Sequence, residues 1–325
     1  MEIFWIVLGA AFASVGLAIA FFAVHSRVVH KRSLMASAVA VYLKIKTPEY
    51  TDDEVHRSIL RLSKSKPRQI KLPKVASRAK MSVHSGMQVA SFEATGNDDL
   101  CIIYMHGAGY VRPPRYQHWR FAARIAERTG ASVVFPIYPK APLHTASSVY
   151  PILTELYRPI REKYKKVILM GDSSGGGLAL GLAEQFLSSG IRQPDRLILL
   201  SPYVDLMLKN SEIPVYEMRD PLIKVSNQRI WGKCWAGELD VKDPMVSPIY
   251  GDMMGLPPVT LFAGTHEALF PDIRMLHSIM KDSKVSVDFF VGRGMNHVYP
   301  IYPIPEARGA VDKILLAIEK TQKAY

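Results

Sequence analysis

The chain has few cysteines: Cys101 and Cys234 are the only two in 325 residues. Two cysteines do not form a disulfide framework, and neither a C-x-x-C pair nor a His/Cys cluster at metal-ligand spacing is present. We therefore expect no metal and no cofactor. Cys101 lies in an apolar run, where a packing role is expected. The sequence also has no internal repeat and no low-complexity segment, so neither a repeat architecture nor a disordered chain is expected.

Two further motifs are missing. The glycine-rich run at 171–177 does not contain the lysine of a phosphate-binding loop, so we expect no nucleotide there. The sequence has no N-x-S/T glycosylation acceptor to support a luminal location. With 48% hydrophobic residues, the chain is instead long and apolar enough for one α/β catalytic domain with additions.

Charge is absent from one long segment near the N-terminus. Ile3 to Val24 are 22 consecutive positions without a charged side chain, enough to span a bilayer as a helix. The preceding residues include Glu2 but no Lys or Arg, which disfavours a cleaved signal peptide. The sequence thus predicts a single-pass transmembrane anchor over 1–26, with a cleaved signal or a buried core helix as alternatives.

Most of the net charge of +12 follows this segment. Residues 27–80 contain 14 Lys and Arg against four acids. A basic arm after a span predicts that the rest of the chain faces the cytoplasm and that the arm attracts anionic lipid headgroups. The predicted location is a membrane, the endoplasmic reticulum in a eukaryote. Ser33 to Ile45 is apolar and would lie against the membrane or form part of a lid. Nucleic acid is disfavoured as a partner because the arm adjoins a hydrophobic span.

The most informative motif lies at Ser173. An apolar run, Val167 to Met170, leads into Gly171-Asp172-Ser173-Ser174-Gly175, and a helix is predicted over 178–187. This is G-x-S-x-G between a strand and a helix, the context of a nucleophile elbow. A serine hydroxyl is a weak nucleophile, so it needs a base and an oxyanion hole.

A second glycine-containing loop follows the predicted strand Leu100–Met105. It contains His106, Gly107, Ala108 and Gly109. Backbone N–H groups of Gly107, Ala108 and Gly109, with that of Ser174, are candidate oxyanion donors. A plain turn after a strand is the alternative.

Chain order suggests the base and the acid. After the serine of an α/β-hydrolase come the acid and then the histidine. His297 follows a predicted strand at 285–290 and is the candidate base, whereas His277 lies in a predicted helix. The candidate acid is Glu267, in the loop after a strand at 259–263. Asp272 in the same loop is predicted to cap the next helix.

As a set, these residues resemble the hormone-sensitive-lipase family of α/β-hydrolases, which includes arylacetamide deacetylase and bacterial esterases. That family has H-G-G-G at the oxyanion loop and G-D-S-A-G-G at the serine. This chain has His106-Gly107-Ala108-Gly109 and Gly171-Asp172-Ser173-Ser174-Gly175-Gly176. The resemblance extends from about Val83 to the C-terminus. Ala108 departs from it, and its methyl group would narrow the site.

The resemblance and the alternation of strands and helices predict an α/β-hydrolase fold: a mostly parallel sheet, helices on both faces and a helical cap. The catalytic domain is predicted over 81–325, with a cap insertion at about 203–246. The expected activity is hydrolysis of carboxylic esters through an acyl-enzyme on Ser173. Substrates would be short-to-medium acyl or lipophilic esters, such as acylated sterols, glycerides or xenobiotics. The alternatives are an aryl-acetamide amidase and a non-catalytic ligand-binding protein on the same scaffold.

Overall fold

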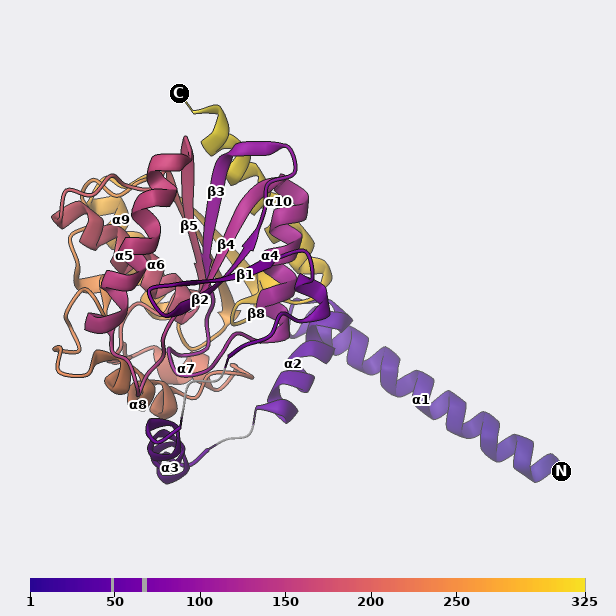
Figure 1. Cartoon of the computed structure of the whole chain (residues 1–325). Coiled ribbons are helices and arrows are strands. Elements are labelled where there is room, and N and C mark those ends of the chain that lie inside the picture. Colours follow the sequence, from indigo (N-terminus) through magenta and orange to yellow (C-terminus); the bar gives the residue numbers. More distant parts are fainter. Residues whose placement is uncertain (48–49, 66–68, 325) are drawn as a thin grey trace.

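The computed structural model describes residues 1–47, 50–65 and 69–324 (Figure 1). Two short parts of the predicted basic arm, 48–49 and 66–68, and the last residue of the predicted catalytic domain, Tyr325, lie outside the described residues.

One eight-stranded sheet forms the centre of the molecule, in the order β1-β2-β4-β3-β5-β6-β7-β8. The pairings from β4 to β8 are parallel, whereas β1 pairs with β2, and β2 with β4, antiparallel. The mostly parallel sheet of the predicted fold class is confirmed. The strands are Lys80–His84, Met87–Phe92, Asn97–Met105, Ala131–Ile137, Lys166–Asp172, Arg196–Leu200, Val259–His266 and Val287–Asn296.

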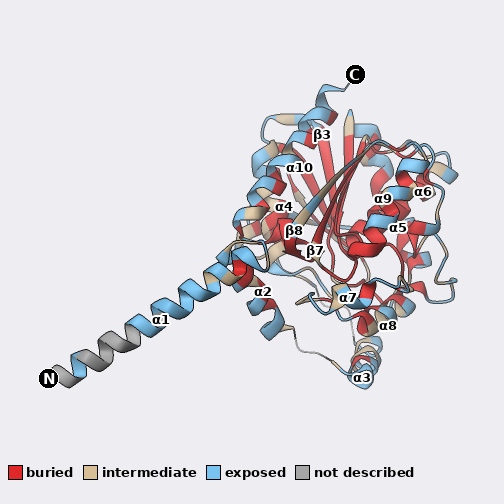
Figure 2. Ribbon diagram, turned by 180° about the vertical axis from the view of Figure 1, so that it is seen from behind, coloured by how far each residue is buried: buried red, intermediate tan, exposed pale blue. Residues whose placement is uncertain are grey.

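Helices cover both faces of this sheet, as Figure 1 shows. One face carries α5 (Ala146–Lys163), α6 (Ser174–Ser188) and α9 (Phe270–Asp282). The other carries α4 (Tyr116–Thr129) and α10 (Pro305–Lys323). Parallel strands covered on both sides need apolar residues at every position rather than at alternate ones. All of β4 and β6 is accordingly buried, and Figure 2 shows the red strands enclosed between the helices.

A helical segment interrupts the alternation between β6 and β7. It contains α7 (Ile213–Glu217), α8 (Val225–Ala236) and a 3-10 turn at Pro248–Tyr250. Trp235 of α8 is fully buried and stacks on Tyr110, with 4.5 Å between the ring centroids. The segment is thereby packed onto the loop that follows β3. Two further 3-10 turns lie at Lys74–Ala76 and Tyr299–Ile301.

Three helices precede the sheet. The first, α1 (Glu2–Val28), projects away from the body in both views (Figures 1 and 2). The second, α2 (Leu34–Lys46), begins at Ser33, whose N–H and hydroxyl both donate to the Glu306 carboxylate at the start of α10. The third, α3 (Asp52–Ser63), has a complete capping box between Thr51 and Glu54 and contacts α8.

The predicted transmembrane anchor is contradicted. Among the residues that the structure describes, no helix is both long enough and apolar enough to cross a membrane. The prediction rested on the absence of charge from 22 positions. Absence of charge alone does not establish sufficient hydropathy over a sufficient length. The predicted membrane location, and anionic lipid as a partner of the basic arm, lose their support with it.

Candidate active site

Ser173 lies at the sharp bend between β5 and α6. Its φ of 53° and ψ of −124° are strained for a residue with a side chain. The flanking glycines permit the bend, because a Cβ on Gly171 would lie 2.2 Å from the Gly175 carbonyl oxygen. A Cβ on Gly175 would lie 2.1 Å from the carbonyl oxygen of Met105. Ser173 is consequently held at the carboxyl edge of the sheet, at the N-terminus of α6.

The structure brings together the three side chains that chain order suggested. The Nε2 atom of His297 lies 2.9 Å from Ser173 Oγ, and its Nδ1 atom lies 2.6 Å from Glu267 Oε2. His297 follows β8 directly, and Glu267 follows β7 directly. All three residues are buried, with 8% of Ser173 exposed and none of Glu267. One imidazole therefore links the serine to the carboxylate.

The surroundings of His297 favour its protonated form. Burial acts to lower its pKa, but the hydrogen bond and the charge of Glu267 oppose this, with smaller contributions from Asp220 and Asp172. The net result is a pKa raised above the usual value of a histidine. An imidazole in this position accepts a proton readily and is stabilised once it carries the charge.

The Glu267 carboxylate is itself held on its second oxygen. Oε1 accepts a hydrogen bond of 2.6 Å from the Gly264 N–H and one of 3.1 Å from the Ser201 hydroxyl. The Ser201 hydroxyl in turn accepts from the Val298 N–H at 3.0 Å. Ser201 therefore ties the carboxylate to the residue that follows His297. Sequence reasoning did not assign it this role, because the contacts join residues 66 and 97 positions apart.

Asp172, directly before the serine, has its own set of partners. It accepts from the Tyr104 hydroxyl at 2.6 Å, and His118 Nε2 lies 3.2 Å from its other oxygen. Burial acts to raise its pKa, but His118, Tyr104 and a backbone hydrogen bond from Gly107 together lower it. Asp172 thus connects β3, β5 and α4 beneath the serine.

The four predicted oxyanion residues differ in how their backbone groups are placed. Ala108 and Gly109 line the cavity beside Ser173, with φ values of 109° and 64°. The backbone of Gly107 is engaged by Asp172. Ser174 is the first residue of α6, where a backbone N–H has no partner within the helix, and its hydroxyl accepts from Tyr110 N–H at 3.3 Å.

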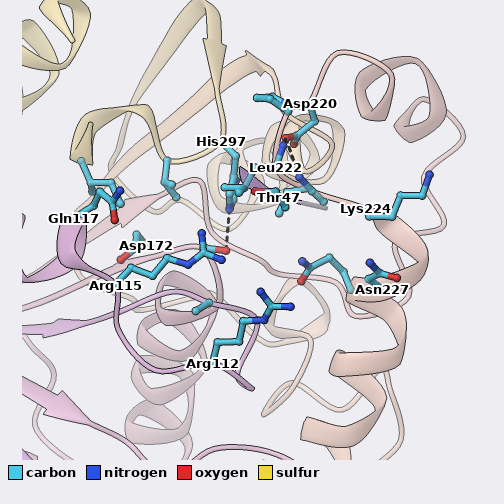
Figure 3. A pocket seen from close by; sticks show the side chains of 18 of the residues that line it. Thr47, Arg112, Arg115, Gln117, Asp172, Asp220, Leu222, Lys224, Asn227 and His297 are labelled. Carbon is cyan, nitrogen blue, oxygen red and sulfur yellow. Dashed lines mark hydrogen bonds between the residues drawn. The ribbon is translucent and has the colours of Figure 1, made fainter. Parts of the chain in front are cut away.

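The cavity in front of Ser173 has a volume of about 330 Å³ (Figure 3). Ala108 and Gly109, Asn227 and Trp231 of α8, and Thr47 near the end of α2 contribute to its walls. Lys44, near the end of the segment predicted to lie against a membrane or in a lid, also lines the cavity. Among the described residues, no group of three or more His, Cys, Asp or Glu is arranged to hold a metal ion.

Two sequence predictions are corrected here. Asp272 does not cap a helix: α9 begins at Phe270, Leu269 is its N-cap, and Asp272 is buried in the first turn. Pro271 in that first turn is compatible with the earlier start. Residues 292–296 belong to β8 rather than to a loop, because Asn296 still pairs with His266 of β7.

Comparisons with known proteins identify the family of the fold. A family model described as an alpha/beta hydrolase fold matches residues 102–301. A protein named as an acetyl-hydrolase, LipR from Mycobacterium tuberculosis, is 31% identical over 219 residues, which are 65% of this chain and 70% of that protein.

Solved structures show the same likeness. One is a crystal structure described as an esterase from Staphylococcus aureus, which is 30% identical in sequence with a TM-score of 0.78. The match covers 83% of this chain and 94% of the esterase chain. A second crystal structure, of an esterase from the bacterial hormone-sensitive lipase family, is 25% identical in sequence with a TM-score of 0.76. The match covers 89% of this chain and 99% of the chain of that esterase.

Proposed function

The chain belongs to the α/β-hydrolase family as a carboxylic ester hydrolase related to hormone-sensitive lipase, and from this premise we propose that it hydrolyses short-to-medium acyl esters through an acyl-enzyme on Ser173. The observation that supports the proposal best is the continuous contact from Ser173 through His297 to Glu267, at 2.9 and 2.6 Å. The order and spacing are those that activate a serine hydroxyl.

In the proposed reaction His297 takes the hydroxyl proton of Ser173 as the oxygen attacks the ester carbonyl carbon. Glu267 holds the imidazole in the required tautomer and stabilises the imidazolium. The carbonyl oxygen becomes negative and is stabilised by backbone N–H groups of Ala108, Gly109 and Ser174, since the backbone of Gly107 is engaged by Asp172. The protonated His297 then donates its proton to the departing alcohol. Water, activated in the same way, releases the acid and restores the serine.

The dimensions of the site favour small acyl groups. A cavity of about 330 Å³ lies at the lower end of the usual range for small-molecule pockets. One relative is named as an acetyl-hydrolase, and acetyl is a small acyl group. We therefore expect the fastest hydrolysis with acetyl to hexanoyl esters and slower hydrolysis of palmitoyl esters.

The experiment is hydrolysis of a p-nitrophenyl ester series, from acetate to palmitate, by the wild-type protein and by Ser173→Ala. The substitution removes the nucleophile, so kcat/KM should fall by at least about 10³-fold. Ser189→Ala, an exposed serine at the other end of α6, is the matched control and should retain full activity.

Equal activity of Ser173→Ala and the wild type would contradict the proposal. No Ser173-dependent hydrolysis of any ester by the folded protein would instead favour an amidase of the aryl-acetamide type or a ligand-binding protein. Hydrolysis of 4-nitroacetanilide would identify the former.

A further inference from the structure

The cavity in front of Ser173 carries an excess of positive charge. Four of its lining residues are cationic: Lys44, Arg112, Arg115 and Lys224. Its only lining carboxylates among the described residues belong to Asp172 and Asp220. Figure 3 shows Arg112 and Arg115 extending into the cavity from the loop after Gly109, and Asp220 across the cavity from them.

Neither carboxylate is free to neutralise these cations. Asp172 is bonded to Tyr104 and His118 beneath the serine. Asp220 accepts hydrogen bonds from three backbone N–H groups, at 2.7 to 2.9 Å, which belong to Leu222, Ile223 and Ala268. None of the ion pairs between described residues involves any of the four cations.

Arg112 is arranged to bind an anion. Its guanidinium carbon lies 4.9 Å from the ring centroid of Trp231 and 5.6 Å from that of Tyr50. A guanidinium stacked on aromatic faces keeps its N–H donors in the plane of the group, where they match the oxygens of a carboxylate or phosphate. Arg115, close enough to act on Arg112 through its charge, is exposed at the same wall.

Two like charges held together in a partly buried cavity repel one another. The repulsion acts, after burial, to lower the pKa of Arg112. An anion bound between Arg112 and Arg115 would remove it and would form charge-assisted hydrogen bonds. A neutral ester would occupy the same cavity without balancing the charge of either guanidinium.

We propose, on the basis of the proposed ester hydrolysis, that the preferred substrates are esters that carry a second, anionic group, and that Arg112 and Arg115 bind this carboxylate or phosphate while the ester carbonyl lies at Ser173. The anion is a recognition group and is not changed in the reaction. Lys44 and Lys224 on the cavity walls add to the positive potential that attracts such a substrate.

The test compares pairs of esters that share the acyl group attacked by Ser173 or the leaving group and that differ by one anionic group. The first pair is the 4-nitrophenyl monoester of glutaric acid and its neutral methyl ester. The second pair is butyryl-glycerol 3-phosphate and neutral monobutyrin. The wild-type protein should hydrolyse the anionic member of at least one pair with a kcat/KM about 10- to 100-fold above its neutral partner, as expected for one or two charge-assisted hydrogen bonds. The preference should shrink as salt is added.

Arg112→Gln and Arg115→Gln should each remove most of this preference, because kcat/KM should fall far more for the anionic ester than for its neutral partner. Arg112→Lys retains the charge but not the planar fork, so it should keep part of the preference. Arg308→Gln is the matched control, because Arg308 is an exposed residue of α10 that does not line the cavity.

The outcomes separate the two proposals. Equal or faster hydrolysis of the neutral member in both pairs would overturn the anionic preference, while Ser173-dependent hydrolysis of p-nitrophenyl butyrate would keep the ester hydrolase intact. An equal loss on both members in the Gln variants would also overturn it, since the arginines would then act only structurally. A preference in one pair alone supports the inference and identifies the anion as carboxylate or phosphate.

Discussion

Ala108 has a backbone conformation that a residue with a Cβ seldom adopts. Its φ is 109°, and it lies in the loop between β3 and α4, beside the serine. Such strain costs about 1–3 kcal/mol and is kept where the surrounding structure determines it. The sequence drew attention to this position as a departure from a glycine pattern. The strain itself follows from the loop geometry, which the departure alone did not reveal.

Replacing Ala108 by glycine should therefore stabilise the protein. The relief of strain exceeds the extra entropy of an unfolded glycine, so Ala108→Gly should raise the free energy of unfolding by about 1 kcal/mol. Urea unfolding measures this. The loop keeps its N–H, so ester hydrolysis should stay within a few-fold of wild type.

Ala123→Gly is the matched control. Ala123 lies within α4, where glycine is a poor helix former, and the same substitution should cost about 1 kcal/mol. A loss of stability in both variants would show that Ala108 is not strained.

At the scale of elements, the site depends on how β3, β5 and α6 meet. The start of α6 packs directly on the end of β3, with the Cα of Gly175 against the carbonyl groups of Met105 and His106. This contact places the oxyanion loop beside the serine. Neither element could provide it alone, because the loop belongs to one and the nucleophile to the other.

A methyl group at Gly175 should separate these elements. In Gly175→Ala the Cβ would lie 2.1 Å from the Met105 oxygen and 2.6 Å from the His106 oxygen, and both are backbone atoms that cannot turn aside. We expect a loss of at least about 3 kcal/mol in unfolding free energy and little activity.

Gly309→Ala provides the contrast for this substitution. A Cβ at Gly309, an exposed residue of α10, meets nothing within 4 Å, so alanine should stabilise the helix by about 1 kcal/mol. Equal stabilities of the two variants in urea would contradict the close contact at Gly175.

At the scale of the whole molecule, acidic groups are buried away from the active serine. Burial, and then the charge of Asp205, raise the pKa of Asp272 to about 7. Neither oxygen of Asp272 has a close hydrogen-bond partner among the described residues. Burial also raises the pKa of Asp205, which accepts from Tyr250 at 3.2 Å. The fold thus contains a carboxyl group that prefers to be protonated near neutral pH.

Because the pKa of Asp272 is raised in the folded protein, the free energy of unfolding depends on pH in a predictable direction. Between the unfolded pKa of about 4 and the folded pKa of about 7, the folded protein binds more protons at Asp272 than the unfolded chain does. The contribution of this group to stability is therefore present at low pH and is lost as the pH rises to about 7. Asp272→Asn, which cannot ionise, should be more stable than wild type at pH 8, by on the order of 2–4 kcal/mol.

The advantage of Asp272→Asn should disappear near pH 4, and urea unfolding at several pH values would show it. Asp282→Asn, an exposed residue at the end of the same helix, should show no such dependence. A constant difference between Asp272→Asn and wild type across this range would contradict the raised pKa.

The sequence alone determined those features that depend on local geometry. G-x-S-x-G between an apolar run and a helix predicts the bend at Ser173, because only that backbone path needs glycines on both sides. The alternation of strands and helices, together with the family resemblance, predicted the fold class, and the chain order of that fold pointed to Glu267 and His297. The sequence analysis misplaced the start of α9 and the end of β8. Both boundaries depend on contacts with neighbouring elements, such as the pairing of β8 with β7.

Only the tertiary structure decided what surrounds the reacting groups. The tie from Ser201 to Glu267, the partners of Asp172 and the contacts of Arg112 with Tyr50 and Trp231 all join residues far apart in the chain. Their energetics depend on burial and on distances of a few ångströms, which no local pattern encodes. The uncharged N-terminal run, conversely, supported an anchor that the described structure contradicts, since lack of charge is a property of composition and a membrane span is a property of a whole helix.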